Sequence, residues 1–298
     1  MIPPGFAPLM NIAGVLTEHE AALRGAIFLA VFLIMAAWEV IAPRRQLALS
    51  RGRRWVANLG ILIVNTALVR AVFPAAAVGI ALFAEDRGVG LLHAFELGVG
   101  LKVLLALIVL DLAIYLQHVM FHAVPLLWRL HRVHHADLDI DVTTGTRFHP
   151  VEMLLSMGVK AAAILVIGPP VLAVLLFEIA LNVTSMFNHS NVHLPRRLDA
   201  VLRWIVVTPD MHRVHHSIRR EETNRNFGFN FPWWDRLFGT YQRQPRDGHE
   251  RMTIGIPEFR DPVTCTTFSG ILALPFVRRR GDAAGAGDRL DHGAGPAG

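Results

Sequence analysis

The sequence of 298 residues contains a single cysteine, Cys265. One thiol excludes an internal disulfide framework, and it also excludes an iron–sulfur cluster held by several cysteines of this chain. Charged residues are scarce as well, at 18% of the sequence, whereas hydrophobic residues make up 53%. This balance is typical of proteins that lie in a lipid bilayer rather than in water.

The arginines do not form the surface that a nucleic acid would need. The formal net charge is +5, but a nucleic-acid groove would combine basic residues with interleaved aromatic residues on a polar domain. The arginines instead lie in short stretches beside apolar runs, as in cytoplasmic loops that face anionic lipid. They are Arg44, Arg45, Arg51, Arg53 and Arg54, and then Arg196, Arg197, Arg219 and Arg220. We expect no nucleic-acid partner.

Apolar runs predict an all-α integral membrane protein. They cover residues 26–42, 56–84, 97–120 and 154–187, and with their flanks they are long enough to cross a bilayer. The second run contains Arg70 and Pro74. It is predicted to be one kinked span, because a hairpin there would move the arginine-rich segments outside. The last run is broken at Gly168-Pro169-Pro170, which predicts a helical hairpin.

The expected fold therefore has about four transmembrane helices plus a hairpin or broken helix pair. The arginine-rich loop at 44–54 is assigned to the cytoplasm by the positive-inside rule. Counting the spans from that loop brings every later histidine cluster to the same side. We expect a cytoplasmic, histidine-rich helical cap on the membrane bundle.

Four histidine clusters predict a metal site. On a helix, residues three or four positions apart share one face, so each cluster presents its imidazoles toward a common point. Imidazole binds iron, zinc, copper and nickel, and ten imidazoles exceed what one ion can use but suit two. The clusters are His118-x-x-x-His122, His131-x-x-His134-His135, His189-x-x-x-His193 and His212-x-x-His215-His216.

Other metal-binding roles fit the sequence less well. A structural zinc site is closed by four ligands and usually includes cysteine, whereas this chain has one cysteine and many histidines. A metal transporter would carry its ligands inside the spans, whereas these clusters lie at the ends of spans and in loops. A histidine-rich membrane protein that binds metal without catalysis, or a metal transporter, stays open as the alternative.

One carboxylate lies in line with the first cluster. Asp111, Tyr115, His118 and His122 fall on one stripe of a helix, and Asp111 lies deep in an apolar run, where it needs a partner. It could accept the outer N–H of a ligating imidazole, or it could pair with Arg70.

The order of the residues around these clusters resembles the fatty acid hydroxylase/sterol desaturase superfamily of membrane proteins. The resemblance covers about residues 97–241 and follows the order and spacing of that family. It is carried by Asp111-x-x-x-Tyr115-x-x-His118-x-x-x-His122, Leu127-Trp128-Arg129-x-His131-Arg132-Val133-His134-His135, Arg147-Phe148-His149-Pro150-x-Glu152, Asn188-His189-x-x-x-His193, Met211-His212-Arg213-Val214-His215-His216, Asn226-Phe227-Gly228 and Trp234-Asp235-Arg236-Leu237-Phe238-Gly239-Thr240.

The resemblance implies an oxidoreductase that uses O2 and two non-haem iron ions to hydroxylate or desaturate a membrane lipid, with zinc able to replace the iron. It implies no catalytic residue apart from the metal ligands. The ligands carried over are His118, His122, His131, His134, His135, His189, His193, His212, His215 and His216. Residues expected beside the ligands are Asp111, His149, Glu152 and Asn188, and His149 could equally lie on the substrate side.

The sequence and the resemblance together predict how the chain is divided, where it lies and which partner it needs. Residues 1–96 are expected to form N-terminal spans, 97–245 the di-iron catalytic domain, and 246–298 an interfacial segment with a disordered tail from Arg278. Trp233, Trp234 and Phe238 are expected at the membrane interface. No cysteine cluster, haem-attachment motif or dinucleotide-binding loop occurs in the sequence, so we expect an external electron donor, a ferredoxin or a cytochrome with its reductase. The expected location is a bacterial inner membrane.

Overall fold

The computed structural model describes residues 19–277, and the tail predicted to be disordered from Arg278 lies outside them. Within the described residues the chain is helical and contains isolated β-bridges but no strand. Five segments are long and apolar enough to cross a membrane. They are α2 (Glu20–Ile41), α3 with α4 (Arg51–Val72 and Ala76–Arg87), α5 (Val99–Ala123), α7 (Pro150–Ile167) and α8 (Val171–His189). The prediction of an all-α integral membrane protein is confirmed.

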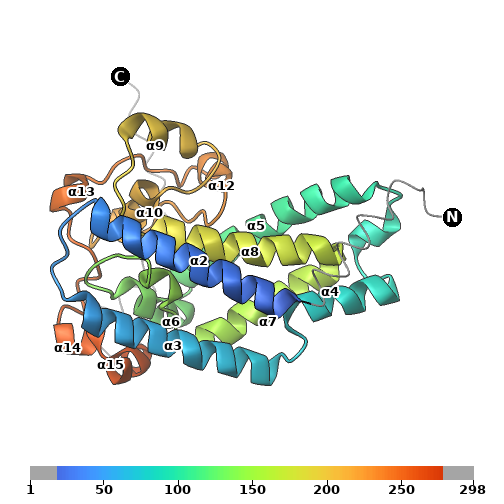
Figure 1. The fold of residues 1–298 in the computed structure, drawn as a ribbon, viewed down its shortest axis with the longest axis horizontal. Helices are drawn as coiled ribbons and strands as arrows, with labels where there is room; N and C mark the ends of the chain where they lie inside the picture. The colour runs from blue at the N-terminus through green and yellow to red at the C-terminus, as the bar shows by residue number, and fades with distance from the viewer. Residues whose placement is uncertain (1–18, 278–298) are drawn as a thin grey trace.

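The second apolar run forms one kinked path. Helix α3 ends at Val72 and α4 begins at Ala76, so the break falls at Pro74, which has no N–H to continue a helix. In Figure 1, α4 continues outward from the far end of α3 instead of turning back beside it. Arg70 is exposed on the last turn of α3 and does not mark the tip of a hairpin. The path agrees with the predicted kinked span.

The predicted break at residues 168–170 separates α7 from α8. Gly168 ends α7 in a left-handed conformation, with φ of 62°, and the two prolines that follow prevent the helix from continuing. A side chain at Gly168 would lie 2.4 Å from the carbonyl oxygen of Val89. Glycine is therefore required both by the backbone conformation and by the close approach of the neighbouring loop.

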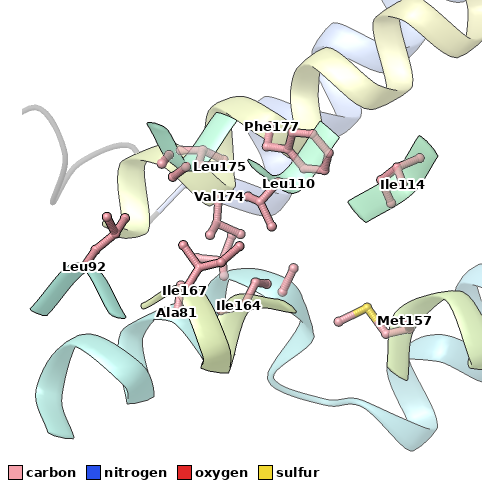
Figure 2. Packing of buried hydrophobic residues seen from close by; sticks show 14 residues of the cluster. Ala81, Leu92, Leu110, Ile114, Met157, Ile164, Ile167, Val174, Leu175 and Phe177 are labelled. Atoms are coloured by element: carbon pink, nitrogen blue, oxygen red, sulfur yellow. The ribbon is translucent and has the colours of Figure 1, made fainter. Parts of the chain in front are cut away.

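The far half of the bundle is held by an apolar core. Figure 2 shows Ile164 and Ile167 of α7 packed among Val174, Leu175 and Phe177 of α8, with Leu110 of α5 and Ala81 of α4 close by. Since lipid is as apolar as these side chains, the packing is stabilised by close van der Waals contact rather than by transfer out of water.

A balanced group of charges ties three spans together beside that core. Glu178 of α8 accepts hydrogen bonds from Lys160 of α7 at 2.5 Å and from Arg24 of α2 at 2.9 Å. Arg24 also pairs with Glu20 at 2.5 Å. A charge within a span is costly unless it is paired, so these pairs fix how α2, α7 and α8 are placed against one another.

The shorter helices gather at one end of the bundle (Figure 1). The arginine-rich segment at 44–54, which is the loop before α3 and its first turn, lies at this same end. The cap consists of α6 (Pro125–His135), η2 (Thr144–Thr146), α9 (Arg196–Leu202), α10 (Pro209–His215), α11 (Arg220–Thr223), α12 (Trp233–Leu237), α13 (Gly248–Arg251), α14 (Pro262–Thr266), α15 (Phe268–Ala273) and η3 (Leu274–Phe276). The short η1 (Leu91–Ala94) lies at the opposite end.

A buried ion-pair network joins the cap to the bundle. Arg54, in the first turn of α3, has no exposed surface and forms a two-pronged pair with Asp137 at 2.8 and 2.9 Å. It also donates to Asp141 at 2.5 Å. Both aspartates lie on the segment between α6 and α7. Arg54 therefore holds in place the chain that connects these two helices.

Replacing Arg54 with Met is expected to destabilise the protein by about 3–5 kcal/mol, because Asp137 and Asp141 would stay buried without their cation. The measurement is thermal unfolding of the purified protein in detergent. The exposed neighbour Arg53 provides the matched control, since Arg53→Met is expected to change stability by less than about 0.5 kcal/mol. Equal unfolding temperatures for the two variants would contradict the role of the network.

Candidate metal centre

Nine of the ten predicted ligand histidines come together in two groups at the cap end of the bundle. Within each group, one nitrogen of every imidazole lies within 4.8 Å of the corresponding nitrogens of the others. The first histidine group consists of His118, His122, His131, His135 and His215, and the second consists of His134, His189, His212 and His216. The two groups are adjacent, since the rings of His135 and His216 stack with their centroids 4.7 Å apart.

Four helices deliver these side chains. His118 and His122 lie on the last two turns of α5, and His189 is the last residue of α8. The two HxxHH boxes end α6 and α10, each of which begins with a proline in its first turn. All four helices therefore bring their C-terminal turns to one place.

Each HxxHH box is divided between the two groups. His131 and His135 of α6 belong to the first group, whereas His134 belongs to the second. In α10 the division is reversed, because His212 and His216 belong to the second group and His215 to the first. The four-residue pair of each box shares one face, while the middle histidine is turned toward the neighbouring group. The boxes thus interlock two sites, a division that spacing alone did not reveal.

Fixed acceptors orient the outer nitrogens of four imidazoles. The Nδ1 of His118 lies 2.8 Å from the carbonyl oxygen of Phe227, and that of His215 lies 2.8 Å from the carbonyl oxygen of Arg225. His131 Nδ1 lies 2.6 Å from a carboxylate oxygen of Glu152. His189 Nδ1 lies 2.7 Å from the carbonyl oxygen of Ser185. Because these oxygens only accept, Nδ1 carries the proton in each ring and donates it.

The inner nitrogens consequently face one another as lone pairs. His118 Nε2 lies 3.1 Å from Nε2 of His131 and 3.0 Å from Nε2 of His215. With their protons on Nδ1, no hydrogen bond can form between these three inner atoms. Two nitrogens each about 2.1 Å from a shared cation and at right angles around it would lie about 3.0 Å apart. The first group therefore fits a metal ion.

Several ring nitrogens of these histidines have no hydrogen-bond partner although they are buried. Such groups are rare in native proteins and require an explanation. They belong to both groups and include His122 Nε2, His135 Nε2 and both ring nitrogens of His216. The donor set is all imidazole, which suits iron, zinc, copper and nickel.

Five imidazoles of the cap are neutral at physiological pH. Burial, with added repulsion from neighbouring imidazoles, lowers the pKa of His134, His135, His212 and His216 well below the usual value of 6.5. Burial lowers the pKa of His215 to about 3. A neutral imidazole is the form that binds metal, so binding would not have to displace protons from these rings.

The loop after α11 contacts outer nitrogens of the first histidine group. Asp235 of α12 accepts from the backbone N–H groups of Phe227 and Gly228, both at 2.8 Å, which fixes the carbonyl oxygen that receives His118. Asn226 takes a left-handed φ of 54° and donates to the carbonyl oxygens of Met211 and Gln242. Asn224 Oδ1 lies 3.3 Å from His122 Nδ1. Asn226, Phe227, Gly228 and Asp235 belonged to recognisable motifs, but sequence reasoning gave them no role.

His193 does not join either group. Its side chain is exposed, and its backbone N–H donates to the carbonyl oxygen of Ala42. Helix α8 ends at His189, and the chain then turns into an extended segment. The four-residue spacing therefore no longer places the two histidines on one helical face. We remove His193 from the proposed ligands.

The other residues expected beside the ligands have different roles. Only Glu152 contacts a histidine of the groups. Asp111 contacts neither an imidazole nor Arg70, because its carboxylate accepts from Trp234 Nε1 at 2.8 Å and from the backbone of residues 230 and 231. His149 caps α7 by accepting from the N–H of Val151. Asn188 donates to the carbonyl oxygen of Phe229.

Fold and site together define a membrane protein with two adjacent histidine groups, each of which could hold a metal ion. Residues 103–240 match the fatty acid hydroxylase family model. These residues therefore form a fatty acid hydroxylase domain, and the match supports the predicted resemblance to the fatty acid hydroxylase/sterol desaturase superfamily.

Individual relatives match part of the chain. The ornithine lipid hydroxylase OlsE of Rhizobium tropici is 30% identical over 178 residues, which are 60% of this chain and 51% of that protein. Alkylglycerol monooxygenase of Xenopus tropicalis is 32% identical over 44% of this chain and 28% of its own length. Cholesterol 25-hydroxylase of Rattus norvegicus is 29% identical over 48% and 47%, respectively. The matches span about half or less of these relatives, and no solved structure matches the chain.

Glu152→Gln is expected to weaken metal binding by about 10- to 100-fold, because the neutral amide holds the His131 ring less firmly and reduces its basicity. Competition with a coloured chelator measures this affinity. Glu250→Gln is the control, since that side chain is 78% exposed and lies outside both groups. An unchanged affinity in Glu152→Gln would contradict the orienting role of the carboxylate.

Metal-free protein is expected to lose stability as the pH falls from about 6.5 toward 3. The five cap histidines stay unprotonated in the folded state but take up protons when unfolded, each costing up to about 1.4 kcal/mol per pH unit. Asp235 acts in the opposite direction, since burial raises its pKa to about 6, but it is one group against five.

Unfolding temperatures of chelator-treated protein between pH 8 and pH 5 measure this effect. His193→Ala is the control and should follow the same curve as the unmodified protein, because His193 is exposed. A flat curve below pH 6.5 would show that the imidazoles are not held neutral by burial.

Proposed function

We propose that this protein is an O2-dependent lipid hydroxylase that uses a histidine-ligated di-iron centre. The observation that carries the proposal is the pair of interlocked histidine groups, in the first of which the inner nitrogens of His118, His131 and His215 face one another. The relatives named above are hydroxylases and a monooxygenase of lipids. Their names support insertion of an oxygen atom into a C–H bond rather than desaturation.

The first histidine group would hold one iron and the second group the other. Bound iron supplies the activation of O2 that attack on an unactivated C–H bond requires. The chain itself fixes the ligands through Glu152 and the carbonyl oxygens of Phe227, Arg225 and Ser185. Burial of the imidazoles excludes bulk water from the site, which protects a reactive centre from side reactions.

The overall reaction needs electrons from another protein. One O2, two electrons and two protons convert a C–H bond into an alcohol and release one water molecule. The sequence contains no cysteine cluster, haem-attachment motif or dinucleotide-binding loop. We therefore propose an external ferredoxin, or a cytochrome with its reductase, as the donor.

The substrate in this proposal is a membrane lipid, and the cap faces the cytoplasm of a bacterial cell. Support for this orientation comes from the arginine-rich segment at 44–54, which forms the loop before α3 and its first turn and lies at the cap end of the bundle (Figure 1). Such loops stay on the cytoplasmic side of the inner membrane. The alternative of a metal transporter is less well supported, because the histidines gather at one end of the bundle and do not line a path through it.

Iron analysis of the purified protein tests the metal centre. We expect two irons per chain, and loss of iron in His134→Ala and His215→Ala, which remove one ligand from each group. His193→Ala is the matched control and should keep both irons. One labile zinc, with no oxygen uptake from any donor, would support the non-catalytic alternative instead.

Lipid analysis under isotopically labelled O2 tests the reaction. Cells that express the protein should contain a lipid that carries one labelled oxygen, and this lipid should be absent with His134→Ala and present with His193→Ala. A protein that holds two irons but leaves the lipids unchanged, with donors supplied, would overturn the proposed activity while leaving the metal site standing.

A further inference from the structure

The cap carries an exposed apolar surface that the histidine site does not use. It is formed by α9, the turn after it, and α12 with the residue that follows. We call this surface the apolar apron. Its members, with their exposed fractions, are Leu198 (45%), Val201 (61%), Trp204 (60%), Ile205 (58%), Trp233 (40%), Leu237 (69%) and Phe238 (52%).

The two parts of the apron are joined into one surface. Trp233 Nε1 donates to the carbonyl oxygen of Trp204 at 2.8 Å. The guanidinium of Arg236 lies 3.9 Å from the centre of the Trp204 ring and also donates to the carbonyl oxygen of Arg203 at 2.9 Å. Because these contacts fix α12 against the end of α9, the apolar side chains form a continuous patch. Patches of this kind on a protein surface mark sites of interaction.

The apron continues the lipid-facing surface of a transmembrane helix. Phe238 stacks on Tyr115 of α5 with ring centroids 5.5 Å apart, and Trp234 donates to Asp111 one helical turn further into the span. Leu116, next to Tyr115, is 52% exposed, and Leu104 on the same helix is 54% exposed. The medium that surrounds Leu116 therefore also surrounds Phe238. In a protein that spans the bilayer, this medium is lipid.

Charged residues border the apron where phosphate groups of lipids would lie. Arg196 and Arg197 are exposed at the start of α9, directly before Leu198. A short segment with an apolar face and adjacent arginines is typical of helices that lie in the plane of the membrane surface. The sequence predicted Trp233, Trp234 and Phe238 as interfacial residues. Trp234 is instead half-buried, and its indole bonds to Asp111.

We propose that the apolar apron is embedded in the leaflet on the cap side of the membrane, with α9 and α12 lying in its interface. The partner of this surface is the lipid bilayer itself, not a second copy of the chain. This inference concerns how the cap is seated, so it does not depend on the proposed reaction.

Spin labels on the full-length protein in lipid nanodiscs test the proposal. Labels are attached to cysteines introduced one at a time by Val201→Cys and Leu237→Cys, while the native Cys265 is buried. Collision rates are measured with oxygen, which concentrates in lipid, and with a water-soluble nickel complex. We expect the ratio of oxygen to nickel collisions at both positions to exceed that of a water-exposed label by roughly tenfold.

Two control positions set the scale. Leu33→Cys on α2 is 57% exposed within a span and reports lipid, while Glu221→Cys on the exposed side of α11 reports water. A ratio of oxygen to nickel collisions at either apron position that equals the ratio for the Glu221→Cys label would overturn the proposal. Protection of both apron labels from oxygen and nickel alike would also overturn it, because protein would then cover the surface. Ile205→Cys and Phe238→Cys replace any variant that fails to elute as a single species.

Discussion

The structure depends on one electrostatic constraint, the gathering of nine imidazoles at one place, with the inner nitrogens of His118, His131 and His215 facing one another. In the absence of a cation this arrangement gains no hydrogen bonds at its centre and leaves buried nitrogens without partners. It persists because the outer nitrogens are fixed by acceptors that belong to the rest of the fold. The bundle and cap thus contribute the stability that maintains this arrangement of imidazoles.

The membrane bundle supplies that stability at a distance from the histidines. Its apolar core lies toward the end away from the cap. Near this core, the ion pairs of Glu178 with Lys160 and Arg24 fix the positions of three spans relative to one another. Closer to the site, Arg54 binds the segment between α6 and α7, so that His131 and its partner Glu152 are set by one buried network. Burial of these charges has a desolvation cost, which is offset only because each charge has several partners.

How much of this was predictable depended on whether a feature was local in sequence. The break at Gly168-Pro169-Pro170, the kink at Pro74 and the histidine clusters follow from the chemistry of adjacent residues. The spacing of His189 and His193 indicated one shared helical face only if the helix continued past His189. Helix α8 instead ends there, and the segment that follows is held by hydrogen bonds to the 42–45 loop. Asp111 misled for a similar reason, since its partners lie about 120 residues away in the chain. Long-range pairs such as Arg54 with Asp137 leave no periodic pattern that a single sequence can reveal.

The position of the cap on the membrane and the geometry of the histidines are coupled through α12. This helix carries Leu237 on its exposed side, while its Asp235 accepts from the backbone N–H of Gly228, which shares a peptide unit with the carbonyl group of Phe227. The carbonyl oxygen of Phe227 in turn orients His118. A displacement of α12 would therefore pass through one carboxylate and one peptide unit to an imidazole of the first group. Because orientation of a ligand ring affects metal affinity through such outer contacts, the surface that meets the lipid also helps to determine the shape of the metal site.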